Sequence, residues 1–213
     1  MLDITRVAGK LTFGMAAFLS VLVALVSYRF VPVGVSEAMD FVAHNLENNA
    51  LALYGHIAVA PVALALMPFQ FMSGLRARRP GLHRWMGRGY VAAILVSGVA
   101  GFVLAFHTTA GPVATAGFAI LAVIWLGTTA CAFLFALKRQ IDRHRRWMLR
   151  SAALTFAAVS LRLYLGIAMA FGADYDLTYV IVAWVSWVPN ALLVEAYLLG
   201  RRRSRAATLL PAG

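Results

Sequence analysis

The feature that most limits how this chain can fold is a series of apolar segments, each long enough to cross a membrane as a helix. A bilayer core of about 30 Å needs roughly 20 mostly apolar residues in a helix. Six stretches of the sequence meet this requirement, near residues 11–31, 51–73, 88–107, 114–137, 147–171 and 178–199. The sequence therefore predicts an all-α fold, a polytopic integral membrane helical bundle with six transmembrane helices.

The basic residues predict the orientation of these helices. Of the 19 Lys and Arg residues, 17 fall on one side of the membrane, in the terminal segments, in the alternate loops or, for Arg88 and Arg150, in the first residues of a span. Lys and Arg concentrate on the cytoplasmic side of a membrane, so we expect both termini in the cytoplasm. We predict one six-helix transmembrane domain over residues 1–200 and a basic, flexible cytoplasmic tail over residues 201–213, in a bacterial cytoplasmic (inner) membrane. The opposite loops carry one basic residue, Arg29, and the acids Glu37, Asp40, Glu47, Asp174 and Asp176.

The charge excess indicates the kind of partner. A formal net charge of +11 would suggest nucleic acid in a soluble protein. Here 62% of the residues are hydrophobic, and the charges lie between the apolar segments. The expected partners are therefore the lipid bilayer and its anionic headgroups, and not nucleic acid. The single Cys131 excludes an intrachain disulfide.

The first external loop, about residues 32–50, has a helical pattern of its own. Apolar residues recur at helical spacing as Val35, Met39, Val42 and Leu46, which predicts a short amphipathic helix on the outer surface. A polar stripe runs beside them: Glu37, Asp40, His44 and Glu47. Such a stripe could bind a divalent cation, but a solvated helix face explains it equally well, so no metal site is assigned.

One short pattern occurs twice, each time at the start of an apolar run. Arg84-Trp85-Met86-Gly87-Arg88 directly follows His83, and Arg146-Trp147-Met148-Leu149-Arg150 is separated from His144 by one residue. Arginines four residues apart lie on one helix face and can reach lipid headgroups, and Trp favours the membrane interface. The predicted headgroup or anion contacts are Arg84, Arg88, Arg146 and Arg150. Duplication and convergence both remain open as the origin of the repeat.

A functional alternative for the repeat involves its histidines. His83 and His144 would lie at similar depth near the inner face, where together they could hold a metal or a haem iron. The arginines of the repeat would then neutralise propionates, because a guanidinium binds a carboxylate with two hydrogen bonds. On the outer side, His56 and His107 would also lie at comparable depth. For His56 the alternative is a structural hydrogen bond between two helices.

Arg162 is the clearest functional signal in the spans. It lies roughly nine residues, or about 14 Å, from the outer end of the fifth span. An ionisable residue at that depth is costly and marks a functional interior. Its partner should be a backbone carbonyl, an external acid such as Asp174, or a bound anionic group. The fifth span carries Ser151, Thr155 and Arg162 on one stripe, which we expect to point into the bundle.

Polar residues of three spans suggest a ligand pocket. The predicted lining consists of Gln70, Thr155, Trp187 and Asn190. Pro61, Pro68 and Pro189 can release backbone carbonyls inside the membrane, which is tolerated where a cavity or another helix takes up the bond. Glu195, near the inner end of the sixth span, is expected to pair with Arg150 or Arg146.

The order of these elements resembles a bacterial family of predicted membrane proteins that carries domain of unknown function 2306. The residues that carry the resemblance run from about residue 50 to 198. They are His56, Gln70, Leu82-His83-Arg84-Trp85-Met86-Gly87-Arg88-Gly89-Tyr90, His144-Arg145-Arg146-Trp147-Met148-Leu149-Arg150-Ser151, Leu161-Arg162 and Trp187-Val188-Pro189-Asn190. The resemblance implies the topology but no activity. A weaker likeness, in arrangement alone, is to membrane cytochromes of the cytochrome b561 kind, which carry histidines near each face.

Two functions compete on these observations. The first is a b-type haem-binding electron-transfer or reductase protein, a membrane oxidoreductase that exchanges electrons with a quinone or another redox partner. Its haem b would be bound by His56, His107, His83 and His144, with Arg162 facing a propionate. The second is a cofactor-free binder or transporter of a small anionic or lipid-like ligand, centred on Arg162. A purely structural membrane partner is the third alternative.

Overall fold

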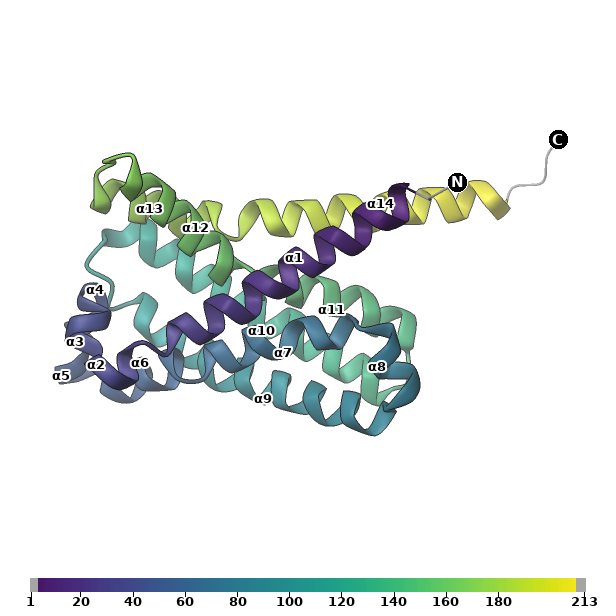
Figure 1. Cartoon of the computed structure of the whole chain (residues 1–213), viewed down its shortest axis with the longest axis horizontal. Helices are drawn as coiled ribbons and strands as arrows, with labels where there is room; N and C mark the ends of the chain where they lie inside the picture. The colour runs from purple at the N-terminus through teal and green to yellow at the C-terminus, as the bar shows by residue number, and fades with distance from the viewer. Residues whose placement is uncertain (1–3, 210–213) are drawn as a thin grey trace. The chain divides into compact units, whose positions relative to one another are not determined.

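The computed structural model describes residues 4–209, in which every regular element is an α-helix (Figure 1). Six stretches of this part are long and apolar enough to cross a membrane, which confirms the predicted all-α, six-span fold. They are Gly9–Val33, Ala50–Phe71, Pro80–Ala105, Gly111–Leu137, Ile141–Ala170 and Tyr175–Arg201. The chain divides into two compact units, Met1–Leu126 and Gly127–Gly213, and α10 (Gly111–Leu137) passes from the first to the second.

The first unit is built around α9 (Pro80–Ala105). Both halves of the second span, α6 (Ala50–Ile57) and α7 (Ala60–Phe71), pack on α9, and α1 (Ile4–Ser27) packs on α7. Its fully buried side chains include Leu53, Tyr90 and Ile94. Glycine allows the close approach of α10, because a Cβ at Gly98 would lie 2.8 Å from Leu126 Cδ2. Small residues serve this purpose where helices meet in membranes.

The second span is interrupted at Ala58 and Val59. Pro61 stands in the first turn of α7, where its missing N–H is tolerated and its ring does not fit a helix continuing from α6. Val62 N donates to Val59 O at 3.1 Å, an i to i+3 bond that tightens the chain at this point. The hydroxyl of Tyr28 donates to Ala58 O at 2.8 Å. A side chain from the end of the first span thereby holds a carbonyl beside the break.

The predicted amphipathic helix of the first external loop is wrong as an element, although its apolar face is correct. Instead of one helix the chain forms four single turns, α2 (Phe30–Val33), α3 (Val35–Ala38), α4 (Asp40–Ala43) and α5 (Asn45–Asn48). The helix cannot run through because Gly34 has φ 85° and Met39 has φ −147°. Val35 and Met39 nevertheless bury against Leu53, and Val42 and Leu46 pack around them.

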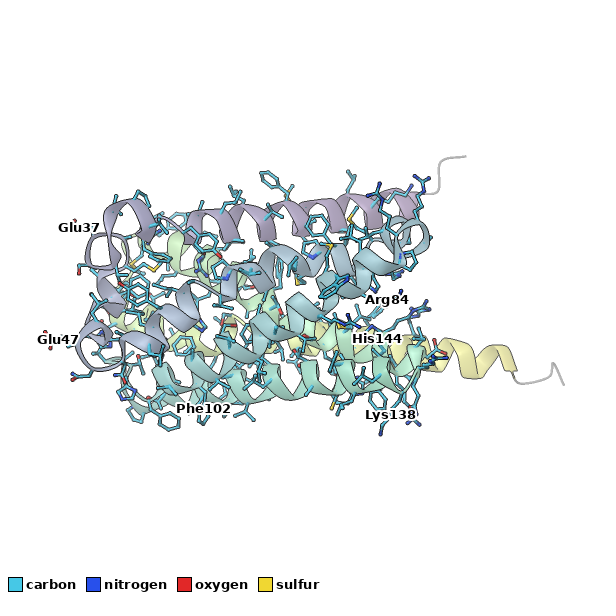
Figure 2. The ribbon with its side chains drawn as sticks, turned by 90° about the horizontal axis from the view of Figure 1, so that it is seen from below. Glu37, Glu47, Arg84, Phe102, Lys138 and His144 are labelled. Carbon is cyan, nitrogen blue, oxygen red and sulfur yellow. The ribbon has the colours of Figure 1, made fainter. Side chains whose placement is uncertain are left out.

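Charges separate the two ends of the first unit. Glu37 and Glu47 lie at one end and Arg84 at the opposite end (Figure 2). Arg29, the one basic residue expected on the acidic side, donates through Nε and Nη2 to Ala38 O at 2.9 and 2.6 Å. Its charge therefore caps the carbonyl end of α3. This contact gives a structural reason for the single exception to the charge pattern.

The second unit contains the fifth and sixth spans, each made of two helices. The fifth consists of α11 (Ile141–Thr155) and α12 (Ala157–Ala170), and the sixth of α13 (Tyr175–Val185) and α14 (Val188–Leu209). α11 packs on α14, and α12 packs on α13. The predicted tail begins inside α14, which continues to Leu209. Residues 210–213 lie outside the described part, and the flexibility of the tail stays a prediction.

Candidate functional site

The fifth and sixth spans are both interrupted near the middle of the membrane. The fifth is broken at Phe156 and the sixth at Ser186 and Trp187. At 1.5 Å per residue, Phe156 lies about 21 Å from the Ala170 end of its span and Ser186 about 16 Å from the Tyr175 end of its own. In a core of about 30 Å, both breaks are central. The backbone stays in the right-handed helical region at both places, with φ −67° and ψ −15° at Phe156 and φ −66° and ψ −29° at Ser186.

The breaks have the tight geometry of a 3₁₀ turn. Val159 N donates to Phe156 O at 2.9 Å, and Trp187 N donates to Trp184 O at 3.3 Å, both three residues back. Pro189 contributes to the second break, since it has no N–H to donate. A 3₁₀ segment in the middle of a helix often marks a functional hinge. Each break here is a single bond of this kind, and the two lie at a similar depth in this unit.

Asn190 joins the helices at these breaks. Its Nδ2 lies 3.0 Å from Ser186 O, 3.3 Å from Ala153 O and 3.1 Å from Ser160 Oγ. The first bond stays within the sixth span, while the other two reach α11 and α12 of the fifth. An amide group has two N–H donors, so these three acceptors share them. The side chain thus links the sixth span to both halves of the fifth.

Hydroxyl groups extend this polar centre along α11. Thr129 and Ser151 are joined through their hydroxyls at 2.7 Å, and Thr155 Oγ1 donates to Ser151 O at 2.9 Å. Ser186 is fully buried, and its Oγ has no hydrogen-bond partner in the described part of the chain. Buried polar groups are nearly always hydrogen-bonded. The Ser186 hydroxyl is therefore an exception to this rule within the described residues.

Arg162 lies on α12 with an exposed side chain. The expectation that its stripe points into the bundle is correct for the buried Ser151 and Thr155 and wrong for Arg162. Its Nη1 donates to Ala158 O at 2.9 Å, which confirms one of the partners expected for it, a backbone carbonyl. Ala158 lies about 18 Å from the outer end of the span, so the guanidinium turns toward the membrane centre and away from the nearer surface. Tyr179 of α13 interacts electrostatically with this charge, and its ring stacks on Tyr175 at 5.7 Å.

Three of the four predicted pocket residues lie at or within one turn of the breaks. Thr155 precedes Phe156, Asn190 links the two spans, and Trp187 belongs to the second break. Trp187 is 7% exposed, and its Nε1 donates to Ala183 O at 2.9 Å. The sequence pattern does not single out Ser160 or Tyr179. Ser160 is identified only by its bond to Asn190, and Tyr179 only by the packing of α13 on α12.

Gln70, the fourth predicted pocket residue, lies in the first unit near the end of α7. It is 7% exposed, and its Nε2 has no hydrogen-bond partner in the described residues. Its backbone carbonyl accepts a bond from Arg76 Nη1 at 3.1 Å. A Cβ at Gly87 would lie 3.2 Å from Gln70 Oε1. The glycine of the first repeated motif therefore makes room for this amide.

The candidate histidines share one kind of hydrogen bond. His56 Nδ1 donates to Ser97 O at 2.8 Å, His107 Nδ1 to Val103 O at 2.9 Å, and His144 Nδ1 to Ala132 O at 2.8 Å. The missing side chain of Gly101 leaves room for the His56 ring, because a Cβ at Gly101 would lie 2.8 Å from His56 Nδ1. Ser97 and Val103 are about 9 Å apart along α9.

The inner pair of histidines is divided between the units. His83 lies in the first turn of α9, and His144 in the first turn of α11. Their meeting at one iron or metal therefore stays a prediction. Across the described side chains, no three His, Cys, Asp or Glu residues come together to hold a metal ion. The acidic stripe of the first external loop thus forms no such group.

The two repeated motifs fold alike but differ in surroundings. Arg88 lies over the Trp85 ring at 5.2 Å, and Arg150 lies over the Trp147 ring at 4.8 Å. In the second copy Arg150 also binds Glu195, with Nε to Oε1 at 2.5 Å and Nη2 to Oε2 at 2.8 Å. The expected pairing of Glu195 is confirmed. Arg84, Trp85 and Arg88 of the first copy are exposed.

Comparison with known proteins gives one match. A family model described as "Predicted membrane protein (DUF2306)" matches residues 53–198. No curated protein and no solved structure matches the chain. The match covers the broken spans, both repeated motifs and Arg162, and it leaves the likeness to cytochrome b561 without support.

Proposed function

The chain belongs to the DUF2306 family of predicted membrane proteins, and we propose that it binds a small anionic or lipid-like molecule inside the bilayer, as a carrier would. The binding site is the centre of the second unit, at the breaks of the fifth and sixth spans. We place the protein in a bacterial cytoplasmic membrane with both termini inside, as the distribution of Lys and Arg favours.

One observation carries this proposal: the fifth and sixth spans are both broken at mid-membrane, and Asn190 links the sixth to both halves of the fifth. In membrane transporters, substrate sites lie near the midplane and are formed by discontinuous helices. The fully buried Ser186 hydroxyl, with no bonded partner in the described residues, offers a further polar contact at this depth.

The chemistry of the ligand follows from the side chains around the breaks. The guanidinium of Arg162 turns toward the membrane centre, where Nη1 donates to Ala158 O. Its planar N–H groups suit a carboxylate or a phosphate. Trp184 and the stacked pair of Tyr175 and Tyr179 offer partly exposed ring surface. An anionic head with an apolar body matches this combination.

The test uses the full chain in nanodiscs of phosphatidylcholine, with dodecanoate and dodecyl phosphate as anionic probes and dodecanol as an uncharged match. Binding is followed by the change in tryptophan fluorescence. We expect the anions to bind more tightly than dodecanol. Replacing Arg162 with Ala should weaken anion binding by about tenfold or more, the value of one or two charge-assisted hydrogen bonds.

Two controls make this test specific. Arg145→Ala removes an exposed arginine from α11 and should leave binding of the anions unchanged. Arg162→Lys keeps the charge without the planar fork and should bind at an intermediate level. Anion binding that survives Arg162→Ala in a folded protein, with an unchanged unfolding temperature, would show that the site is not centred on Arg162.

A haem-binding function is the second candidate, and the histidine geometry is the observation that favours it. Histidines that bind a metal usually donate their other ring N–H to a carbonyl or carboxylate, and His56, His107 and His144 each do so through Nδ1. Haem b, when bound, would supply one-electron transfer. Histidines that only join helices make the same bond, so an optical spectrum decides: a Soret band lost in His56→Ala supports haem, and its absence from the purified protein removes this candidate.

A further inference from the structure

The first repeated motif, Arg84 to Arg88, remains unused by the proposed site. The second copy of the motif forms an ion pair within its own unit, because the Arg150 guanidinium donates two hydrogen bonds to Glu195. The corresponding arginine of the first copy is Arg88. Among the described residues of the first unit, every Asp and Glu lies in the external loop, within residues 37–47, so none is near Arg88 in the sequence. The last arginine of the pattern is therefore paired with a carboxylate in the second unit, whereas in the first unit it is exposed to a possible ligand.

The exposed copy has the parts of a headgroup site. Trp85 is 69% exposed, and the guanidinium of Arg88 lies 5.2 Å from its ring centroid. Arg84, one helical turn before Arg88, is exposed on the same helix face. A guanidinium that lies over an aromatic ring still has its N–H edge for hydrogen bonds to phosphate oxygens. Arg78 and Arg79, just before α9, add two further exposed positive charges.

We propose that Arg84, Trp85 and Arg88 hold the headgroup of an anionic phospholipid. Charge complementarity selects this occupant, since an interfacial tryptophan places the two arginines at the level of the headgroups and basic residues there attract anionic lipids. The lipid phosphate accepts hydrogen bonds from both guanidinium groups, and Trp85 lies along the upper acyl chain. The second copy does not bind lipid in this way, because Glu195 already satisfies Arg150. This inference stands independently of the proposed ligand of Arg162.

The experiment measures phosphatidylglycerol that stays bound to the full chain. The protein is released from mixed micelles of equal parts phosphatidylcholine and phosphatidylglycerol, and bound lipid is counted by native mass spectrometry. We expect at least one phosphatidylglycerol to be retained in preference to phosphatidylcholine. The double substitution Arg84→Gln and Arg88→Gln should weaken that retention roughly thirtyfold, which corresponds to about 2 kcal/mol for two arginines near the surface.

The matched control removes the same amount of charge from the second unit. Arg143 and Arg145 are exposed on α11, and replacing both with Gln should leave the retained lipid in place. Equal loss in the two double variants would overturn the proposal, because it would show a response to net charge only. Full retention in the Arg84→Gln, Arg88→Gln variant would overturn it as well.

Two further arms cover folding and the source of the phosphate. The double variant Arg84→Lys, Arg88→Lys keeps both charges and should fold like the parent chain. It should retain less lipid, because an ammonium group cannot bind phosphate in the bidentate manner of arginine. Undiminished retention in this variant would contradict the role of the guanidinium groups. Excess inorganic phosphate should not displace the lipid. Displacement by phosphate would identify a site for small anions and would overturn the assignment to a phospholipid.

Discussion

Arg150 and Glu195 form a two-bond ion pair that joins α11 to α14, with Nε to Oε1 at 2.5 Å and Nη2 to Oε2 at 2.8 Å. The Arg150 side chain is 21% exposed and that of Glu195 46%. The same guanidinium lies over the Trp147 ring. One arginine of the repeated motif thus connects the start of the fifth span to the inner end of the sixth.

Replacing Glu195 with Gln should lower the free energy of unfolding by about 1–2 kcal/mol. Hydrogen bonds between charged groups contribute about 1.5–3 kcal/mol, and the partial exposure of Glu195 reduces that value. Thermal unfolding in detergent measures the loss. In a chain that already carries Arg150→Gln, the same substitution should cost little, so an equal cost in both backgrounds would contradict a direct interaction.

The Tyr28 hydroxyl should stabilise the break in the second span. Tyr28→Phe removes the bond to Ala58 O and should cost about 1 kcal/mol, the typical net value of one hydrogen bond. Hydrogen exchange should be faster at the amides of residues 58–63 in this variant. Tyr164, which is 40% exposed on α12, provides the control, because Tyr164→Phe should change neither quantity.

Gly101→Ala should displace His56. A Cβ at this position would lie 2.8 Å from Nδ1 and 3.0 Å from Cε1 of the imidazole. Overpacking of this kind costs about 1–3 kcal/mol, and a thermal unfolding curve would show it. Removing the ring with His56→Ala should restore tolerance to Gly101→Ala. Gly127, with nothing within 4 Å of its added Cβ, should accept Ala without loss of stability.

Asn190→Ala should loosen both broken spans. The substitution removes the donor shared by Ser186 O, Ala153 O and Ser160 Oγ, and each buried acceptor left unsatisfied costs about 1–3 kcal/mol. We expect the total loss to be about 2–3 kcal/mol, with faster hydrogen exchange around residues 153–160 and 186–191. Asn48→Ala, at an exposed position of α5, should stay within about 0.5 kcal/mol of the parent. Equal effects of the two substitutions would refute the joining role of Asn190.

The spans could be predicted from the sequence because their signal is simple. Membrane crossing depends on the length and apolarity of a segment, and all six predicted ranges overlap the observed ones closely. The breaks inside them are different. Pro61 and Pro189 signal two of the three, but Phe156 stands in a continuous apolar run with no proline near it. No local feature of the sequence marks that interruption.

The candidate site could be predicted only in part for the same reason. The rarity of a deep arginine identifies Arg162, and the pairing of Glu195 follows from its position near the inner arginines. The hydrogen bonds of Asn190 require that the sixth span pack against the fifth in one register. The external segment illustrates the opposite case, where helical spacing identifies Val35 and Met39 as buried but does not indicate the backbone reversal at Gly34.

The breaks divide the second unit into two pairs of packed helices. One pair is α11 packed on α14 and joined by the ion pair of Arg150 and Glu195, and the other pair is α12 packed on α13. The ion pair of Arg150 and Glu195 lies wholly within the first of these pairs, and the bond from Asn190 Nδ2 to Ser160 Oγ joins that pair to α12. The second unit is therefore held together by two different kinds of bond, a charged pair between α11 and α14 and a neutral amide that reaches both halves of the fifth span.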